Sequence, residues 1–418
     1  MWLDTVPATS WAFGWFLLCA AVFYWGQQPL RQFLAGKQTA ALGWLLAIAL
    51  LVRLLPIVLL PVGAGYDIES FLLVGRAILA GQEVYTSEAF GRHPYLPMQM
   101  YLIGAALWAA RHTFIPFVVW IKLPGLLADV GITAVIFHAS RRQTTTETAH
   151  HYALLYALNP ISLLVTAYHG QFDAVAVLLL LLAWYFYQFE QQNRSATALG
   201  FAILNKTWPA VFLPIAFIRL PNWRSKLTYA LIAAAIPIAF TLLYILIFAA
   251  DPAPMLRRAL THAGVAGYWG HSAIVAVAAR FVGSLQPIYD GLLVLQRPLL
   301  LLTGLLTLWL TRSQTALNAL VTIILTEFAV SVGMGIQWLL WVVPFAILSG
   351  DVWWLRLYSF TGSLFLLGQL YGLHMYPWAF QLFGQETGDL LIRISSIPAW
   401  VTVVLWAWHR LRPVRRFA

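Results

Sequence analysis

Residues 227–249 read LTYALIAAAIPIAFTLLYILIFA and contain no charged side chain. A helix needs about 20 predominantly apolar residues to cross the hydrocarbon core of a bilayer. The rest of the chain has the same character, because 61% of its 418 residues are hydrophobic, only 10% are charged and the mean hydropathy is +0.77. Soluble domains carry about 25% charged residues. The sequence therefore predicts an all-α, polytopic integral membrane protein.

Similar apolar runs recur along the chain and predict about 11–13 transmembrane helices. The predicted spans lie near residues 9–26, 39–61, 94–110, 114–138, 150–168, 172–189, 196–218, 227–249, 291–311, 315–332, 337–349, 352–373 and 390–409. We expect them to form one transmembrane domain over residues 1–418, with short helices in its external loops.

Three polar stretches, near residues 62–93, 250–290 and 374–389, are too long to be plain turns. Long loops in compact architectures are usually functional or disordered. These stretches are rich in aromatic residues, glycine and histidine, which favours folded loops over disorder. We expect the three loops to pack on one face of the membrane, above an active site.

Lysine and arginine mark the cytoplasmic loops of membrane proteins. They occur in the loop 27–38, which holds Lys37, in the loop 219–226, at Arg312 and in the basic C-terminal tail. These segments are therefore predicted to be cytoplasmic, and the three long loops to be external.

Two segments leave the topology open. Counting spans places residues 139–151 outside despite their two arginines, unless 114–138 is broken at 122–125. Residues 196–218 contain the sequence NKTWP at 205–209. A broken or re-entrant helix would fit there, because proline and polar groups at membrane depth must line a cavity.

Composition also excludes several classes of protein. The net charge of +10 follows from basic cytoplasmic loops and needs no nucleic-acid partner. The single cysteine, Cys19, allows neither a disulfide framework nor a cysteine metal site. No lysine or arginine precedes the first apolar run, which argues against a cleaved signal peptide. The chain has no Walker motif and no soluble region long enough to bind a nucleotide sugar.

The first long loop begins with Gly65-Tyr66-Asp67-Ile68-Glu69, directly after a predicted span. A general base that serves a membrane substrate needs a carboxylate near the interface, and Asp67 and Glu69 have this position. The structural alternative is that these acids cap the helix that follows.

Lys122, Asp129, Asp173 and Lys206 are ionisable residues that fall inside predicted spans. An ionisable residue inside the membrane is expensive and indicates a functional site by default. Lys122 and Asp129 are seven residues apart and therefore lie on one helix face. Either they contact substrate, or they pair with groups on other helices and fix the fold.

His169, Gln171 and Asp173 lie close together at a predicted helix start. One interpretation is an N-terminal cap with interhelical hydrogen bonds. The other is a polar wall that binds a sugar or a phosphate.

Four segments together resemble the GT-C superfamily of membrane glycosyltransferases, which use polyprenyl-phosphate sugars. They are the loop 65–97, the K-x-P-x-x-x-A-D-like segment 120–129, the N-P…H-G-Q-F-D-like segment 159–173 and the Q-W-x-x-W-x-x-P-like segment 335–344. The pattern is similar to bacterial mannosyltransferase-like proteins, to glycosylphosphatidylinositol mannosyltransferase I and to the dolichyl-phosphate-glucose α-glucosyltransferases. The segment 94–97 departs from the family, because its two prolines are spread apart.

The resemblance implies an inverting transfer of a hexose, mannose or glucose favoured, from a polyprenyl-phosphate carrier to a lipid-linked or glycolipid acceptor. It implies that Asp67 is the general base and that Glu69 orients the acceptor. It implies substrate-binding roles for segments that include His93, Gln337 and Trp338. We expect no metal and no other cofactor.

The leaving phosphate gains negative charge as its bond breaks, so a cation or a helix N-terminus should lie beside it. The second long loop supplies candidates, namely Arg257, Arg258, His262 and His271. Arginine suits bidentate phosphate contact, although these arginines can instead meet lipid headgroups. Lys206 and Arg76 are two further candidates.

Two other classes remain open. A transporter or flippase of lipid-linked saccharides would explain the interrupted segment around Lys206, but no internal repeat supports it. A non-catalytic scaffold subunit would explain the aromatic content but not Asp67. We expect a monomer in the plasma (inner) membrane of a prokaryote, with the active site on the external face; an organelle membrane is the alternative.

Overall fold

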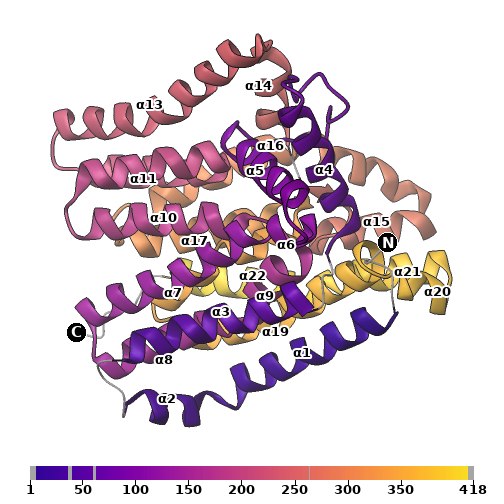
Figure 1. Cartoon of the computed structure of the whole chain (residues 1–418), viewed down its shortest axis with the longest axis horizontal. Coiled ribbons are helices and arrows are strands. Elements are labelled where there is room, and N and C mark those ends of the chain that lie inside the picture. Colours follow the sequence, from indigo (N-terminus) through magenta and orange to yellow (C-terminus); the bar gives the residue numbers. More distant parts are fainter. Residues whose placement is uncertain (1–5, 36–39, 60–62, 263, 413–418) are drawn as a thin grey trace. The chain divides into compact units, whose positions relative to one another are not determined.

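The computed structural model describes residues 6–35, 40–59, 63–262 and 264–412. Helices make up most of this part of the chain (Figure 1). Its strands are β1 (Val265–Ala266) and β2 (Gly333–Met334), which form one short antiparallel pair. The structure is therefore all-α, as predicted.

Contacts divide the chain into two compact units, with the boundary after His262. The prediction of a single domain stays a prediction. Three predicted features lie outside the described residues, namely Lys37, the start of the first long loop at residue 62, and residues 413–418 of the basic tail.

The described residues of the first unit form fourteen α-helices and two short irregular helical turns. The α-helices are α1 (Val6–Tyr24), α2 (Gln27–Ala35), α3 (Ala41–Leu59), α4 (Gly65–Leu79), α5 (Met98–His112), α6 (Phe117–Trp120), α7 (Leu123–Gln143), α8 (Thr146–Ala157), α9 (Pro160–Leu163), α10 (Asp173–Gln188), α11 (Gln192–Asn205), α12 (Phe212–Arg219), α13 (Trp223–Phe248) and α14 (Pro252–Thr261). The irregular turns are a π-helical turn at Leu164–His169 and a 3-10 turn at Trp208–Val211.

Helix α7 is central to this unit. It packs against α3, α8 and α10, and α11 and α13 continue the row beyond α10, as Figure 1 shows. Helix α4 packs along α5. The start of α4 is thereby held close to the row of long helices.

The second unit is built around α22 (Ser396–Leu411), which packs against α15 (Gly270–Phe281), α17 (Ala316–Val330) and α19 (Val352–Gln369). Its other helices and turns are α16 (Gln286–Leu310), α18 (Val343–Leu348), α20 (Trp378–Phe383), α21 (Gln385–Ile394), a π-helical turn at Leu370–His374, and 3-10 turns at Gly283–Leu285 and Ile336–Leu340.

In the described part of the chain, five helical segments are long and apolar enough to cross a membrane. They are Ala41–Leu59, Phe117–Gln143, Trp223–Phe248, Gly283–Leu310 and Gln385–Leu411. Helix α13 exposes large apolar side chains such as Leu231 (61%) and Leu246 (80%). Contiguous apolar surface of this kind is expected to face lipid.

The predicted number of about 11–13 spans exceeds these five because several apolar runs do not form one continuous helix. The run 150–168 is interrupted at Leu158–Asn159, between α8 and α9, and then becomes the π-helical turn. The run 196–218 is interrupted at Lys206, which follows the end of α11. The broken helix considered for 196–218 is therefore confirmed.

Arg53 of α3 and Asp129 of α7 form a fully buried ion pair, with 2.7 Å between Nε and Oδ2. Tyr156 Oη and Ser162 Oγ donate hydrogen bonds to Asp129 Oδ1, at 2.5 and 2.9 Å. Arg53 Nη1 donates to the carbonyl of Ala157, the last residue of α8, at 2.8 Å. The pair therefore joins α3, α7, α8 and α9, and it satisfies a carbonyl that the helix end leaves open.

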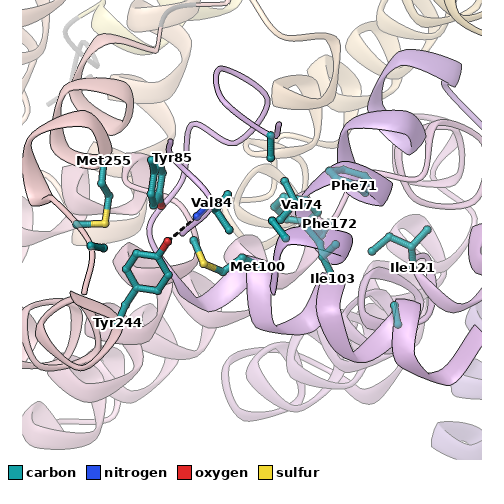
Figure 2. Packing of buried hydrophobic residues seen from close by; sticks show 14 of the residues in the cluster. Phe71, Val74, Val84, Tyr85, Met100, Ile103, Ile121, Phe172, Tyr244 and Met255 are labelled. Carbon is teal, nitrogen blue, oxygen red and sulfur yellow. Dashed lines mark hydrogen bonds between the residues drawn. The ribbon is translucent and has the colours of Figure 1, made fainter. Parts of the chain in front are cut away.

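A second cluster fixes the loop between α4 and α5. Figure 2 shows Phe71, Met100 and Phe172 packed in one buried hydrophobic cluster. At its other end, Tyr244 Oη of α13 accepts a hydrogen bond from Val84 N, at 2.9 Å, and donates one to Glu83. These hydrogen bonds hold the loop between α4 and α5 against α13.

The buried pair gives a first prediction. Arg53→Met leaves the Asp129 carboxylate buried without its ion partner, so we expect the unfolding free energy in detergent to fall by about 3–5 kcal/mol. The double variant Arg53→Met/Asp129→Leu should recover part of this loss, because it removes both charges. Denaturant unfolding curves of the three proteins test this; equal stability of Arg53→Met and wild type would contradict it.

Candidate active site

Asp67 lies in the first turn of α4. The N-cap residue of this helix is Ala64, whose side chain makes no cap hydrogen bond. The backbone N–H of Ala64 donates to the carbonyl of His169, at 3.0 Å. The start of α4 is therefore fixed against the π-helical turn.

The Asp67 carboxylate accepts two side-chain hydrogen bonds at the same oxygen. His169 Nε2 lies 2.5 Å and Gln171 Nε2 2.8 Å from Asp67 Oδ2. His169 is only 2% exposed, whereas the Asp67 side chain is 24% exposed. Of the two groups in this pair, Asp67 is thus the one that a substrate can reach.

The π-helical turn Leu164–His169 positions both donors. Wide π turns occur mostly as short segments and often at functional sites. After it, the N–H groups of Gly170 and Gln171 both donate to Val165 O, at 3.2 Å. Gly170 has φ +88°, a conformation that glycine adopts without steric penalty. The reversal at Gly170 brings His169 and Gln171 to the same carboxylate.

Asp173 and Lys206 form a second buried ion pair beside this turn. Lys206 Nζ lies 2.6 Å from Asp173 Oδ2, and their side chains are 3% and 0% exposed. The same ammonium lies over the rings of Tyr95 and Phe172, 4.6 and 4.7 Å from their centroids. The interruption after α11 is thus stabilised by an ion pair and by cation–π contacts.

His93 is 2% exposed and its ring lies 5.4 Å from that of Tyr95. Burial lowers the pKa of His93 to about 4; a hydrogen bond with the Leu96 backbone opposes this shift, and the charge of Lys206 adds to it. His93 is therefore neutral at pH 7.

His262, just after α14, has Lys206, Arg258, Asp173 and Asp67 as its electrostatic neighbours. Surrounding protein atoms lower the pKa of His262, and the positive charges of Lys206 and Arg258 lower it further. The residue as a whole remains accessible to solvent, so water weakens the contribution of burial. The second long loop thus brings a neutral imidazole and a guanidinium toward Asp67.

Glu69 does not converge with Asp67. Residues i and i+2 of a helix lie about 200° apart around its axis. The Glu69 side chain is 64% exposed, and its Oε2 lies 3.8 Å from Arg92 Nη1. Arg92 also lies over the Tyr66 ring, 4.3 Å from its centroid. The two acids of the motif therefore have separate surroundings.

The other predicted residues of the first unit have varied positions. Arg76 is exposed in the last turn of α4, about 13 Å along the helix from Asp67 at 1.5 Å per residue. Arg257 is exposed on α14, and Arg258 donates to the carbonyl of Gly91. Asp129 belongs to the buried network with Arg53, so its contacts are those of a residue that fixes the fold.

His271, Gln337 and Trp338 belong to the second unit. His271 lies on α15, and its ring centroid is 5.8 Å from that of Trp400. Gln337 is buried, and Trp338 stacks on Trp341 at 5.0 Å. Their predicted contact with the substrate stays a prediction.

Sequence reasoning missed three residues that shape the first unit, namely Arg53, Arg92 and Tyr95. Arg53 is the only charged residue in the predicted span 39–61, and the high energy of intramembrane charge could have identified it. Arg92 lies in the first long loop, and Tyr95 lies just after it in the segment 94–97, where no charge in an apolar run marks these two positions.

Within the described ranges, no three His, Cys, Asp or Glu side chains come together as a metal site requires. No protein-family model matches the chain, and no curated protein matches it. The candidate site therefore rests on its own geometry and on the sequence motifs.

The neutral state of His93 gives a second prediction. Below pH 6.5 the unfolded chain takes up a proton at this residue, whereas the folded chain does so only near pH 4. We expect stability to fall as the pH is lowered from 6.5 toward 4, and His93→Phe to reduce this loss. Thermal unfolding at pH 7.5 and pH 5 measures the effect, with the exposed His112→Gln as the matched control. A pH dependence that His93→Phe leaves unchanged would show that other groups cause it.

Proposed function

We propose that this protein is an inverting membrane glycosyltransferase, which moves a hexose from a polyprenyl-phosphate carrier to a lipid-linked or glycolipid acceptor. The observation that carries the proposal is the partly exposed Asp67 carboxylate, which two buried donors orient at the start of α4.

Asp67 has the properties that a general base requires. The hydrogen bonds from His169 and Gln171 stabilise its anionic form and fix its orientation. Because His169 is buried, the carboxylate and not the imidazole is positioned to meet an acceptor hydroxyl. A well-placed base of this kind contributes about 10²–10⁴-fold to the rate.

In the proposed reaction, the acceptor hydroxyl gives its proton to Asp67 as its oxygen attacks the anomeric carbon of the donor. The bond between that carbon and the phosphate oxygen breaks, and its electron pair leaves with the polyprenyl phosphate. Attack and departure occur on opposite sides of the carbon, so the anomeric configuration inverts. Asp67 then returns its proton to water.

The leaving phosphate becomes more negative as the bond breaks, so nearby positive charge stabilises the transition state. Lys206 and Arg258 are both electrostatic neighbours of His262, which also has Asp67 as a neighbour. Lys206 is largely neutralised by Asp173, whereas Arg258 is partly exposed and uses a carbonyl as its observed partner. We assign the direct phosphate contact to Arg258.

A lipid-carried donor and acceptor agree with a chain that has several helices apolar enough to span a bilayer and no long polar segment that could bind a nucleotide sugar. The proposal includes mannose or glucose as the favoured hexose. It also includes a prokaryotic plasma membrane, with Asp67 on the external face.

One observation favours a second candidate function, transport of a lipid-linked saccharide. The helix interruption at Lys206 with its buried partner Asp173 is of the kind that transporters use at substrate sites. Movement of a fluorescent lipid-linked sugar across vesicles, without any glycosidic bond formed, would favour transport over transfer.

Replacement of Asp67 tests the proposal. With a panel of polyprenyl-phosphate hexoses and glycolipid acceptors, we expect Asp67→Asn to lower sugar transfer by about 10²–10⁴-fold while the protein stays folded. The matched control is Glu88→Gln, which removes an exposed acid from the same loop and should keep wild-type activity. Transfer that survives in folded Asp67→Asn would exclude Asp67 as the base.

A further inference from the structure

Lys122 is a buried lysine at the N-cap position of α7, only 1% exposed. Its Nζ donates to the carbonyl of Ala167 at 2.6 Å and to that of Tyr168 at 3.3 Å. Both carbonyls belong to the π-helical turn that ends at His169. The Lys122 amino group is therefore directed at the backbone just before the residue that contacts Asp67.

The turn needs such a partner. The last carbonyls of a helix have no N–H partner within it and carry partial negative charge. Here the carbonyl of His169 accepts from Ala64 N, at 3.0 Å. Those of Ala167 and Tyr168 accept from Lys122. A lysine ammonium with several donors suits two neighbouring carbonyls.

The stem of Lys122 also fits closely against the reversal at Gly170. A Cβ added to Gly170 would lie 3.0 Å from Lys122 Cε and 3.3 Å from Ile68 Cδ1. Ile68 is the residue next to Asp67. The lysine, the turn and the start of α4 are therefore packed as one assembly, with little room for movement.

We propose that Lys122 is a positioning residue for Asp67: it fixes the π-helical turn, and the turn holds His169 and Gln171 against the carboxylate. The inference rests on the proposed function for its kinetic test, but its structural claim does not. It assigns to Lys122 a role other than that of a substrate ligand.

The kinetic test uses Lys122→Met, which keeps an unbranched apolar chain but removes the donors. His169 and Gln171 should then be less well aligned with Asp67. Because a misplaced base lowers the rate by about one order of magnitude or more, we expect kcat to fall at least about 10-fold and KM to change less than about 3-fold. The acid limb of the pH–rate profile should move to higher pH, because the Asp67 anion loses hydrogen bonds that stabilise it. Lys226→Met is the control, since it removes a lysine from the N-terminal turn of α13.

An activity-independent test follows amide hydrogen exchange of residues 164–172. We expect exchange to be faster in Lys122→Met than in wild type, and unchanged in Lys226→Met. Gly170→Ala disturbs the same turn in another way, because its φ of +88° strains any side chain. In a double-mutant cycle, the effects of Lys122→Met and Gly170→Ala on amide exchange of residues 164–172 should therefore be less than additive.

The outcomes separate the inference from the proposed function. Faster exchange with no sugar transfer even in wild type would support the positioning role and count against the glycosyltransferase proposal. Unchanged exchange would overturn the positioning role whether or not transfer occurs. Where transfer occurs, a raised KM at unchanged kcat would overturn it as well. If Lys122→Met does not fold, the milder Lys122→Gln, which keeps a donor without the charge, carries the same test.

Discussion

Backbone carbonyls at interrupted helices are the constraint on which the first unit depends. In an apolar environment each of these groups must find a hydrogen-bond donor within the protein. Arg53 supplies one to Ala157 at the end of α8, and Lys122 supplies two at the end of the π-helical turn. Two buried basic side chains therefore stabilise the segment that runs from α8 to His169, the residue that contacts the candidate base.

The candidate site follows from this arrangement. A continuous helix from 146 to 188 would place His169 and Gln171 about 200° apart on its surface. The π-helical turn and the left-handed Gly170 instead direct both side chains to Asp67. The candidate site therefore depends on the irregular backbone, and the irregular backbone depends on the hydrogen bonds that Arg53 and Lys122 donate to it.

The sequence predicted the helical fold, and it singled out Asp129, Asp173 and Lys206, which the structure places in buried ion pairs, because a charge in an apolar run has a high energy. It did not predict their partners. The sequence places Lys122 and Asp129 on one helix face and leaves open whether they contact substrate or pair with other helices. In the structure Asp129 pairs with Arg53 from α3, and Lys122 donates to carbonyls of the π-helical turn. Asp67 was found from a motif, whereas the contact with His169 depends on a reversal that hydrophobic periodicity does not show.

The central claim is that Asp67 activates an acceptor for direct displacement at the anomeric carbon. The most direct measurement is the anomeric configuration of the product, determined by NMR after reaction with a β-linked polyprenyl-phosphate mannose. A single displacement predicts an α-linked product. A β-linked product would show net retention and would contradict an Asp67 that acts only as a base.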